Sequence, residues 1–119
     1  MDIAKYKAKL SNNVIAPIIE YMEELGKNCE YSKKDVQKCE DILAEYLESL
    51  AALSFPTDND IMKCVKKAVL ALNKLNEKTD YALIETVERE NIWELIQTSA
   101  VECGLQNPAE DITEEWRDW

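Results

Sequence analysis

The sequence predicts an all-helical fold, an antiparallel bundle or array of four to five helices with a short C-terminal turn. The chain of 119 residues has only 2 Gly and 3 Pro, whereas the hairpins of β-rich folds need residues that tolerate positive φ angles. Apolar residues recur every three or four positions over most of the chain, which is helical spacing. With 46% apolar and 32% charged residues, residues 1–119 are expected to form a single domain.

The first segment has a helical pattern with one interruption near residues 11–13. Its apolar residues are Ile3, Tyr6, Leu10, Val14, Ile15, Ile18, Ile19, Met22 and Leu25. Pro17 follows the interruption, and proline lacks the backbone N–H that a helix interior requires. Two interpretations are therefore open: a short helix followed by a second one starting near Asn13, or one kinked helix. Gly26 is expected to end the segment in either case.

The middle of the chain carries two long apolar stripes, each preceded by a capping residue. Ser32 is expected to cap the first helix, and Phe55-Pro56 to end it, because the residue before proline is pushed out of the α region. Thr57 is expected to cap the next helix. The stripes consist of Val36, Cys39, Leu43, Tyr46, Leu50 and Leu53 in the first helix and of Ile61, Val65, Ala68, Leu72 and Leu75 in the second. Their regular steps of three and four predict that both helices pack against the core.

A fourth helix is expected to begin at a Thr86 cap and to end at Gly104. Its broad apolar face includes Trp93, which we expect to pack into the core because a large ring gains most from burial. The preceding link, residues 81–84, is too short to be assigned to a strand or a loop from its pattern.

Residues 105–119 are interpreted as an acidic, tryptophan-containing tail docked on the helical domain. Thr113 is expected to cap a last turn that ends at Trp116. Two interpretations of the tail tryptophans are open: the rings pin the tail to the helices, or one of them anchors a partner protein as aromatic hot spots do. The candidate partner-binding residues are Glu110, Asp111, Glu114, Glu115, Trp116, Asp118 and Trp119.

Catalytic chemistry has little support in the sequence. The chain has no His, which removes the commonest general base and the nucleophiles that depend on it. No glycine-rich loop is present to cradle phosphates. We therefore predict a non-enzymatic protein with no cofactor. An enzyme that uses carboxylates alone is the weaker hypothesis, with the candidates Glu85, Glu90 and Glu94.

Metal binding is not predicted. The four cysteines form no Cys-x-x-Cys pair, and we expect small buried thiols in a reducing compartment at Cys29, Cys39, Cys64 and Cys103. Some carboxylates recur at helical spacing, but Ca²⁺ needs six to eight oxygen ligands from a shaped loop. The carboxylates at helical spacing are instead typical of solvated helix faces; they include Asp41, Glu45, Glu48, Glu90 and Glu94.

Composition also bears on partners and location. The net charge of −10 opposes phosphate approach, so no nucleic-acid partner is predicted. The lysines that lie off the second apolar stripe, in the helix that Thr57 caps, are expected to form a solvated face: Lys63, Lys66, Lys67 and Lys74. No apolar stretch has the length of a membrane span or of a signal-peptide core. We therefore predict a cytoplasmic protein with no membrane association.

Acidity is concentrated in the last third of the chain. Residues 77–119 have a formal charge of −9, whereas residues 1–76 are nearly neutral. The acidic residues of this third are Glu77, Asp80, Glu85, Glu88, Glu90, Glu94, Glu102, Glu110, Asp111, Glu114, Glu115 and Asp118. A field of one sign over part of a small protein steers association with oppositely charged partners.

Three sequence segments resemble a family of small bacterial helical proteins of unknown function. The segments are Asn73-Lys74-Leu75-Asn76-Glu77, Leu83-Ile84-Glu85-Thr86 and Asp111-Ile112-Thr113-Glu114-Glu115-Trp116-Arg117-Asp118-Trp119. The resemblance covers roughly the last third of the chain. In size and acidity the chain is also similar to immunity proteins, small cytosolic inhibitors that protect bacteria from toxins. That second similarity is one of class and not of motif, and it implies no catalytic residue.

The leading hypothesis for function is an acidic protein-binding module of the immunity type, which occludes a basic protein such as a nuclease toxin. Carboxylates on such an inhibitor replace the phosphates that a nuclease expects. The alternative is a structural or regulatory helical protein that self-associates through an apolar helix face. The chain is thus expected to be a monomer or a homodimer in addition to any partner it binds.

Overall fold

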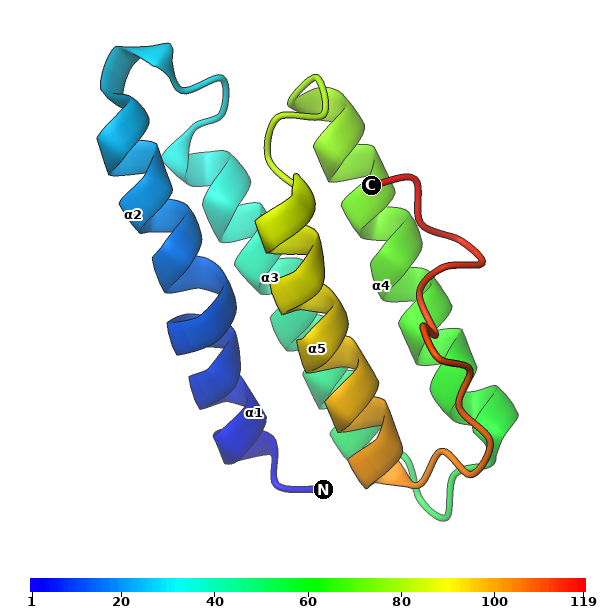
Figure 1. Cartoon of the computed structure of the whole chain (residues 1–119). Coiled ribbons are helices and arrows are strands. Elements are labelled where there is room, and N and C mark those ends of the chain that lie inside the picture. Colours follow the sequence, from blue (N-terminus) through cyan, green and yellow to red (C-terminus); the bar gives the residue numbers. More distant parts are fainter.

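A computed structural model describes all 119 residues, which form four helical arms and no strand (Figure 1). The all-helical prediction is confirmed. Consecutive arms run in opposite directions, giving an elongated bundle of 47 × 27 × 21 Å. The elements are α1 (Ile3–Lys9), the π-helical η1 (Leu10–Ile15), α2 (Ala16–Leu25), the 3₁₀ turn η2 (Gly26–Asn28), α3 (Lys33–Ala51), α4 (Asp58–Lys78) and α5 (Thr86–Cys103).

The first arm is one continuous helix in which α1 and α2 are joined by the π-helical segment η1. The backbone N–H of Ala16 donates to the carbonyl of Ser11, five residues earlier. Pro17 has no N–H to donate, and its ring would crowd the carbonyl of Asn13 in a regular α-helix. The wider π turn accommodates the proline, so the interruption in the sequence pattern marks a local widening and not the end of a helix. Gly26 ends the arm at a φ of 54°.

Both middle helices begin at the predicted caps. Ser32 and Asp35 form a capping box at α3, and Thr57 and Asp60 form another at α4. A hydrogen bond from the Ser32 backbone N–H is the main reason that the pKa of Asp35 lies below its usual value. The predicted end of α3 is wrong by several residues, because the helix stops at Ala51 and the chain then turns before Pro56.

Apolar side chains from all four arms form one continuous core. The apolar stripes of α3 and α4 supply much of this core, and the contact between α3 and α4 is the most extensive between any two helices. A buried polar network crosses the core: the Tyr46 hydroxyl is 3.0 Å from the Ile96 carbonyl oxygen and 2.9 Å from Ser99 Oγ. This network joins α3 to α5 without leaving a buried hydroxyl unpaired.

The link between α4 and α5 is a loop, and the side chain of Asn76 organises it. Asn76 Oδ1 accepts from the Ile84 N–H at 2.9 Å, and the Asn76 carbonyl accepts from the Tyr81 N–H at 2.7 Å. Asp80 and Tyr81 adopt positive φ values of 56° and 62°. The prediction of a Thr86 cap is wrong, because Glu85 occupies the N-cap and its N–H donates to Glu88.

Two expectations about burial need correction. Trp93 is half-buried and lies outside the core cluster, at the edge of a surface hollow. All four cysteines are free thiols, but only Cys39 is fully buried, while Cys29, Cys64 and Cys103 are partly exposed. No helix has the length and apolar character that a membrane span requires.

Candidate protein-binding surface

The acidic tail begins where α5 ends in a Schellman motif. The Leu105 N–H donates to the Ala100 carbonyl at 3.1 Å, and the Gly104 N–H donates to the Val101 carbonyl at 3.0 Å. This motif needs a residue at positive φ, and Gly104 has a φ of 120°. Beyond it, residues 106–119, which we call the strap, turn back and run beside α4 on the same side of the bundle as α5 (Figure 1).

Three polar side chains on the helices clamp the backbone of the strap. Asp58, in the first turn of α4, accepts from the N–H groups of Gln106 and Asn107 at 2.8 and 3.2 Å. Asn73 on α4 and Gln97 on α5 each use the full side-chain amide, with the oxygen accepting one strap N–H and the nitrogen donating to one strap carbonyl. Asn73 pairs with Asp118 and Trp116 at 3.1 and 2.8 Å, and Gln97 pairs with Ile112 and Ala109, both at 3.0 Å.

Apolar contacts support these clamps from the inner side of the strap. Ile112 is 3% exposed and Trp119 is 7% exposed, and both belong to the core cluster. Trp116 is half-buried against the same cluster, and Lys66 Nζ lies 5.9 Å from the centre of its ring. The tail tryptophans therefore face the helices: Trp119 is buried as a latch, and Trp116 keeps part of its surface in contact with solvent.

Asp111 is the electrostatic centre of the strap. Its Oδ1 accepts from the backbone N–H and the hydroxyl of Thr113 at 2.9 and 2.6 Å, and its Oδ2 pairs with Arg117 Nη2 at 3.1 Å. Burial raises the pKa of Asp111, but these hydrogen bonds and the guanidinium together outweigh burial and hold the pKa below its usual value. Thr113 begins the last turn through its carbonyl, although its hydroxyl donates to Asp111.

A polar hollow of about 380 Å³ lies between α5 and the strap. Its lining comprises Arg89, Glu90, Trp93, Glu110, Asp111, Glu114 and Arg117. Arg117 is already paired with Asp111, whereas the carboxylates of Glu90, Glu110 and Glu114 have no cation within ion-pair distance. The hollow therefore combines one half-buried indole with carboxylates that are free to pair with a cation from outside.

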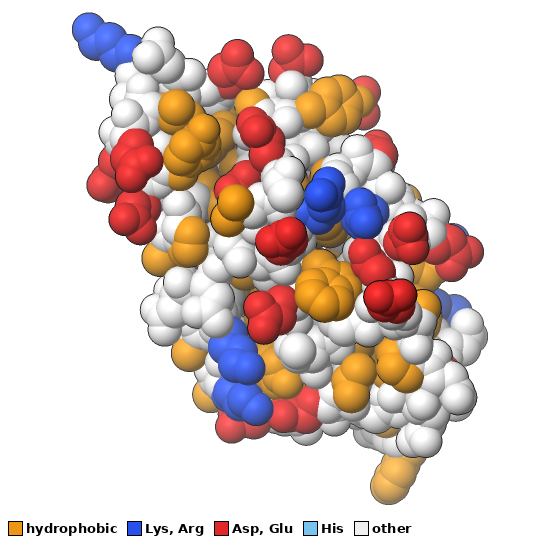
Figure 2. All heavy atoms as spheres, viewed as in Figure 1, with side chains coloured by type: hydrophobic (Ala, Val, Ile, Leu, Met, Phe, Trp, Pro, Cys, Tyr) orange, Lys and Arg blue, Asp and Glu red, His pale blue; other side chains and the backbone are white.

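Most carboxylates of the last third lack a partner. Only Glu102, which pairs with Lys5 at 3.2 Å, and Asp111 form ion pairs among the acidic residues of positions 77–119. Figure 2 shows the face that carries α5 and the strap, where acidic side chains outnumber basic ones and surround small apolar areas. The negative field of this region is therefore not cancelled by internal pairing, and it extends into solvent.

The structure brings some of the candidate residues together and separates others. Glu110, Asp111 and Glu114 meet around the hollow, whereas Glu115 and Asp118 are exposed outside its lining. The sequence pattern did not indicate the clamps Asp58, Asn73 and Gln97, nor Arg89 and Trp93 as lining residues. Apolar periodicity does not predict which polar side chains bind the backbone of a distant segment. The one available signal at Asn73 and Gln97 is the position of a side-chain amide beside an apolar stripe.

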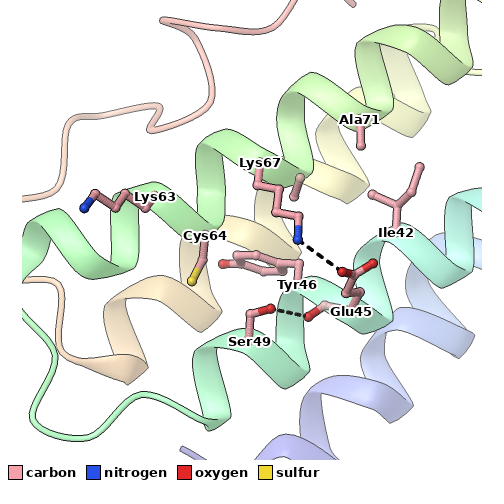
Figure 3. Close-up of a pocket in the computed structure, with 9 residues that line it drawn as sticks. Ile42, Glu45, Tyr46, Ser49, Lys63, Cys64, Lys67 and Ala71 are labelled. Atoms are coloured by element: carbon pink, nitrogen blue, oxygen red, sulfur yellow. Dashed lines mark hydrogen bonds and ion pairs between the residues drawn. The ribbon is translucent and has the colours of Figure 1, made fainter.

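A second hollow, of about 230 Å³, lies between α3 and α4 (Figure 3). Tyr46 and Cys64 point into it, Lys67 reaches across it to Glu45 at 3.2 Å, and Lys63 points away. Burial raises the pKa of the Cys64 thiol, so the reactive thiolate is disfavoured. No three His, Cys, Asp or Glu side chains of the protein are grouped to hold a metal ion.

The chain matches no protein-family model, no curated protein and no solved structure.

Proposed function

We propose that this protein is a non-enzymatic acidic binding module of the immunity type, which occludes a basic partner protein such as a nuclease toxin. The observation that carries the proposal is the set of unpaired carboxylates on α5 and the strap. An ion pair already formed inside the protein would have to be broken for the partner, but free carboxylates offer their full charge. The resemblance in size and acidity to immunity proteins adds to this support.

The arrangement suits a partner that expects phosphates. Glu110 and Glu114 border a hollow in which a lysine or arginine of the partner would meet both carboxylates and the indole of Trp93, beside Arg89 and Arg117. Cations favour such an aromatic face, most of all that of tryptophan. Charge complementarity then speeds the encounter by roughly 10- to 1,000-fold at low ionic strength, and the advantage falls as salt is added.

The test is affinity capture from the natural host at low and high salt, with the intact chain and two charge variants. One variant carries Glu110→Gln, Glu114→Gln, Glu115→Gln and Asp118→Asn. The matched control removes four exposed carboxylates from α2 and the link that follows it, at Glu20, Glu23, Glu24 and Glu30. We expect a stoichiometric basic protein that is recovered by the intact chain and the control, lost with the strap variant and weakened by salt.

Two results would contradict the proposal: no stoichiometric basic partner at low salt, or equal losses with the two variants. A captured partner should also lose its own activity when the intact chain is added, since the proposal is occlusion and not mere attachment. The residual activity of the partner, measured against the ratio of the two proteins, distinguishes these possibilities.

Self-association is the second candidate function. The apolar stripes of α3 and α4 that suggest it are buried within the bundle. Large exposed apolar residues remain at scattered positions, among them Ile19 at 39% and Leu70 at 41% exposure. Sedimentation at high concentration tests this alternative, because a homogeneous monomer would exclude it.

A further inference from the structure

The strap differs from the rest of the molecule in how its backbone is held. Hydrogen bonds between two main-chain groups that involve residues 106–119 all stay within the strap, and none of them joins it to a helix. The strap is attached by the side chains of Asp58, Asn73 and Gln97 alone, together with the packing of its inner residues. Losing these few contacts would free the segment without breaking any helical hydrogen bond.

The docked strap also leaves polar groups unsatisfied. Three buried side-chain donors in the protein have no hydrogen-bond partner: Trp93 Nε1, Arg117 Nε and Trp119 Nε1. Two of them belong to the strap, and the third lines the hollow that the strap helps to form. A buried donor without a partner opposes the state that buries it, because water would satisfy it in the open state. The two donors on the strap, Arg117 Nε and Trp119 Nε1, therefore oppose its docked position.

Opening has a defined boundary. Leu105 is buried and fixed by the Schellman motif, whereas residues 106–110 are all exposed. Within the strap, the Asp111 carboxylate joins Thr113 and Arg117, and Arg117 Nη1 donates to the Trp119 carbonyl at 2.9 Å. This internal network links the part held by Gln97 to the part held by Asn73, so neither part is free to move alone.

We propose that residues 106–119 open from α4 and α5 as one unit while the four helical arms stay folded. Opening separates Glu110, Asp111 and Glu114 from Glu90 and so dismantles the hollow. The strap thereby acts as a switch that assembles or removes an acidic surface. This inference concerns the protein by itself and does not depend on the identity or existence of a basic partner.

Amide hydrogen exchange of the intact chain, followed by NMR, tests the inference. The reporters are the strap amides that donate hydrogen bonds to the clamp side chains, namely those of Gln106, Asn107, Ile112 and Asp118. We expect these four amides to exchange through one common open state of the strap. This open state should be at least tenfold more populated than the state in which the Leu72 amide of α4 is exposed. Unchanged exchange at Leu72 while the strap opens would show that the helices stay folded.

A single clamp variant then tests whether the strap moves as a unit. Asn73→Ala removes the two hydrogen bonds to Trp116 and Asp118, and it should raise opening by roughly tenfold to a hundredfold. The increase should appear equally at Ile112, which is held by the other amide clamp, and Gln97→Ala should raise exchange at Asp118 in the same way. Asn91→Ala is the matched control, because Asn91 is a half-buried α5 residue with no hydrogen bond to the strap.

Three results would overturn the inference. Strap amides could exchange only as fast as Leu72, which would make the strap an integral part of the bundle. Asn73→Ala could affect Asp118 but leave Ile112 unchanged, which would mean that the strap frays piece by piece. The Asn91→Ala control could accelerate strap exchange as much as the clamp variants do, which would remove the role assigned to the clamps.

Discussion

The pair of helices α3 and α4 and the strap are held to the molecule in two different ways. The helix pair buries long apolar stripes, in which Leu43, Leu47 and Leu72 have no exposed surface. The strap buries Ile112 and Trp119 but depends on side-chain amides and one carboxylate for its position. Apolar burial scales with area and tolerates many substitutions, whereas a clamp depends on particular atoms. The stability of the helix pair therefore depends on buried volume, and the position of the strap depends on a few particular hydrogen bonds.

The largest expected effect comes from a cavity in the helix pair. Leu72→Ala should lower the free energy of unfolding by about 2–5 kcal/mol, because a fully buried leucine loses its contacts and leaves a cavity. Urea titration followed by far-UV circular dichroism measures it. Leu70→Ala in the same helix is the control, since Leu70 is 41% exposed and should change stability little. Equal losses in the two variants would contradict the packing described for α4.

The second largest effect is expected from loss of the N-cap at the start of α4. Thr57→Ala removes the side-chain acceptor for the Asp60 N–H and should cost about 1 kcal/mol of stability. The same urea titration measures it, with Ser54→Ala as a control in the preceding turn. A loss as large as that of Leu72→Ala would mean that local capping, and not apolar packing, dominates the stability of this region.

Acid should weaken the docking of the strap. The pKa of Asp111 is lowered in the folded protein, so the ionised carboxylate favours docking above the pKa of an unfolded aspartate, about 3.9. This contribution is lost as the pH falls through the folded pKa. All three tryptophans contact or belong to the strap region. Their fluorescence should therefore change as the pH falls below about 4 and through the lowered pKa of Asp111.

Asp111→Asn is the control for that prediction. Asparagine retains an acceptor for Thr113 but has no charge for Arg117, so the strap should already be loosened at neutral pH. The acid-dependent change in fluorescence should then be smaller. A change of the same size in this variant would assign the acid effect to other carboxylates.

The smallest effect is expected at the outer edge of the helix pair. Lys67 and Glu45 form an ion pair across the hollow between α3 and α4, but both side chains are highly exposed, at 75% and 65%. Solvent screens such a pair strongly. Lys67→Gln should therefore leave the urea midpoint unchanged within error. A clear destabilisation would show that charge contributes to this region as well as apolar packing.

The helices were predictable because their signal is repeated along the chain. The stripes of α3 and α4 extend over several turns, and a capping residue precedes each of them. The end of α3 was placed too late because Leu53 continues the apolar spacing after the backbone has already left the helix. The Thr86 cap failed for a similar reason: Glu85 is an unusual cap, and the residue type alone favoured its neighbour.

The candidate site was predictable in its charge but not in its geometry. Composition alone located the acids, because a count of charges does not depend on folding. The position of the strap depends on single contacts between residues far apart in the chain, such as that of Asn73 with Asp118. An asparagine on a helix has many ordinary roles, so no local pattern distinguishes a clamp from a solvated side chain. Trp93 was misplaced because an apolar ring also suits the wall of a hollow.

The π-helical segment of the first arm also sets its tolerance of insertions and deletions. A turn closed over five residues holds about one residue more than an α turn, and Tyr6, Leu10, Val14 and Ile18 follow one another at intervals of four. Each such interval exceeds a full α-helical turn by about 40°, so the π turn keeps the two ends of the arm facing the same core. Deletion of one residue near Asn12 would convert the π turn into an α turn and leave Tyr6 and Leu10 facing the core, but the ring of Pro17 would then crowd a carbonyl of the preceding turn. Pro17, more than the length of the segment, is therefore the reason for the π turn at this position.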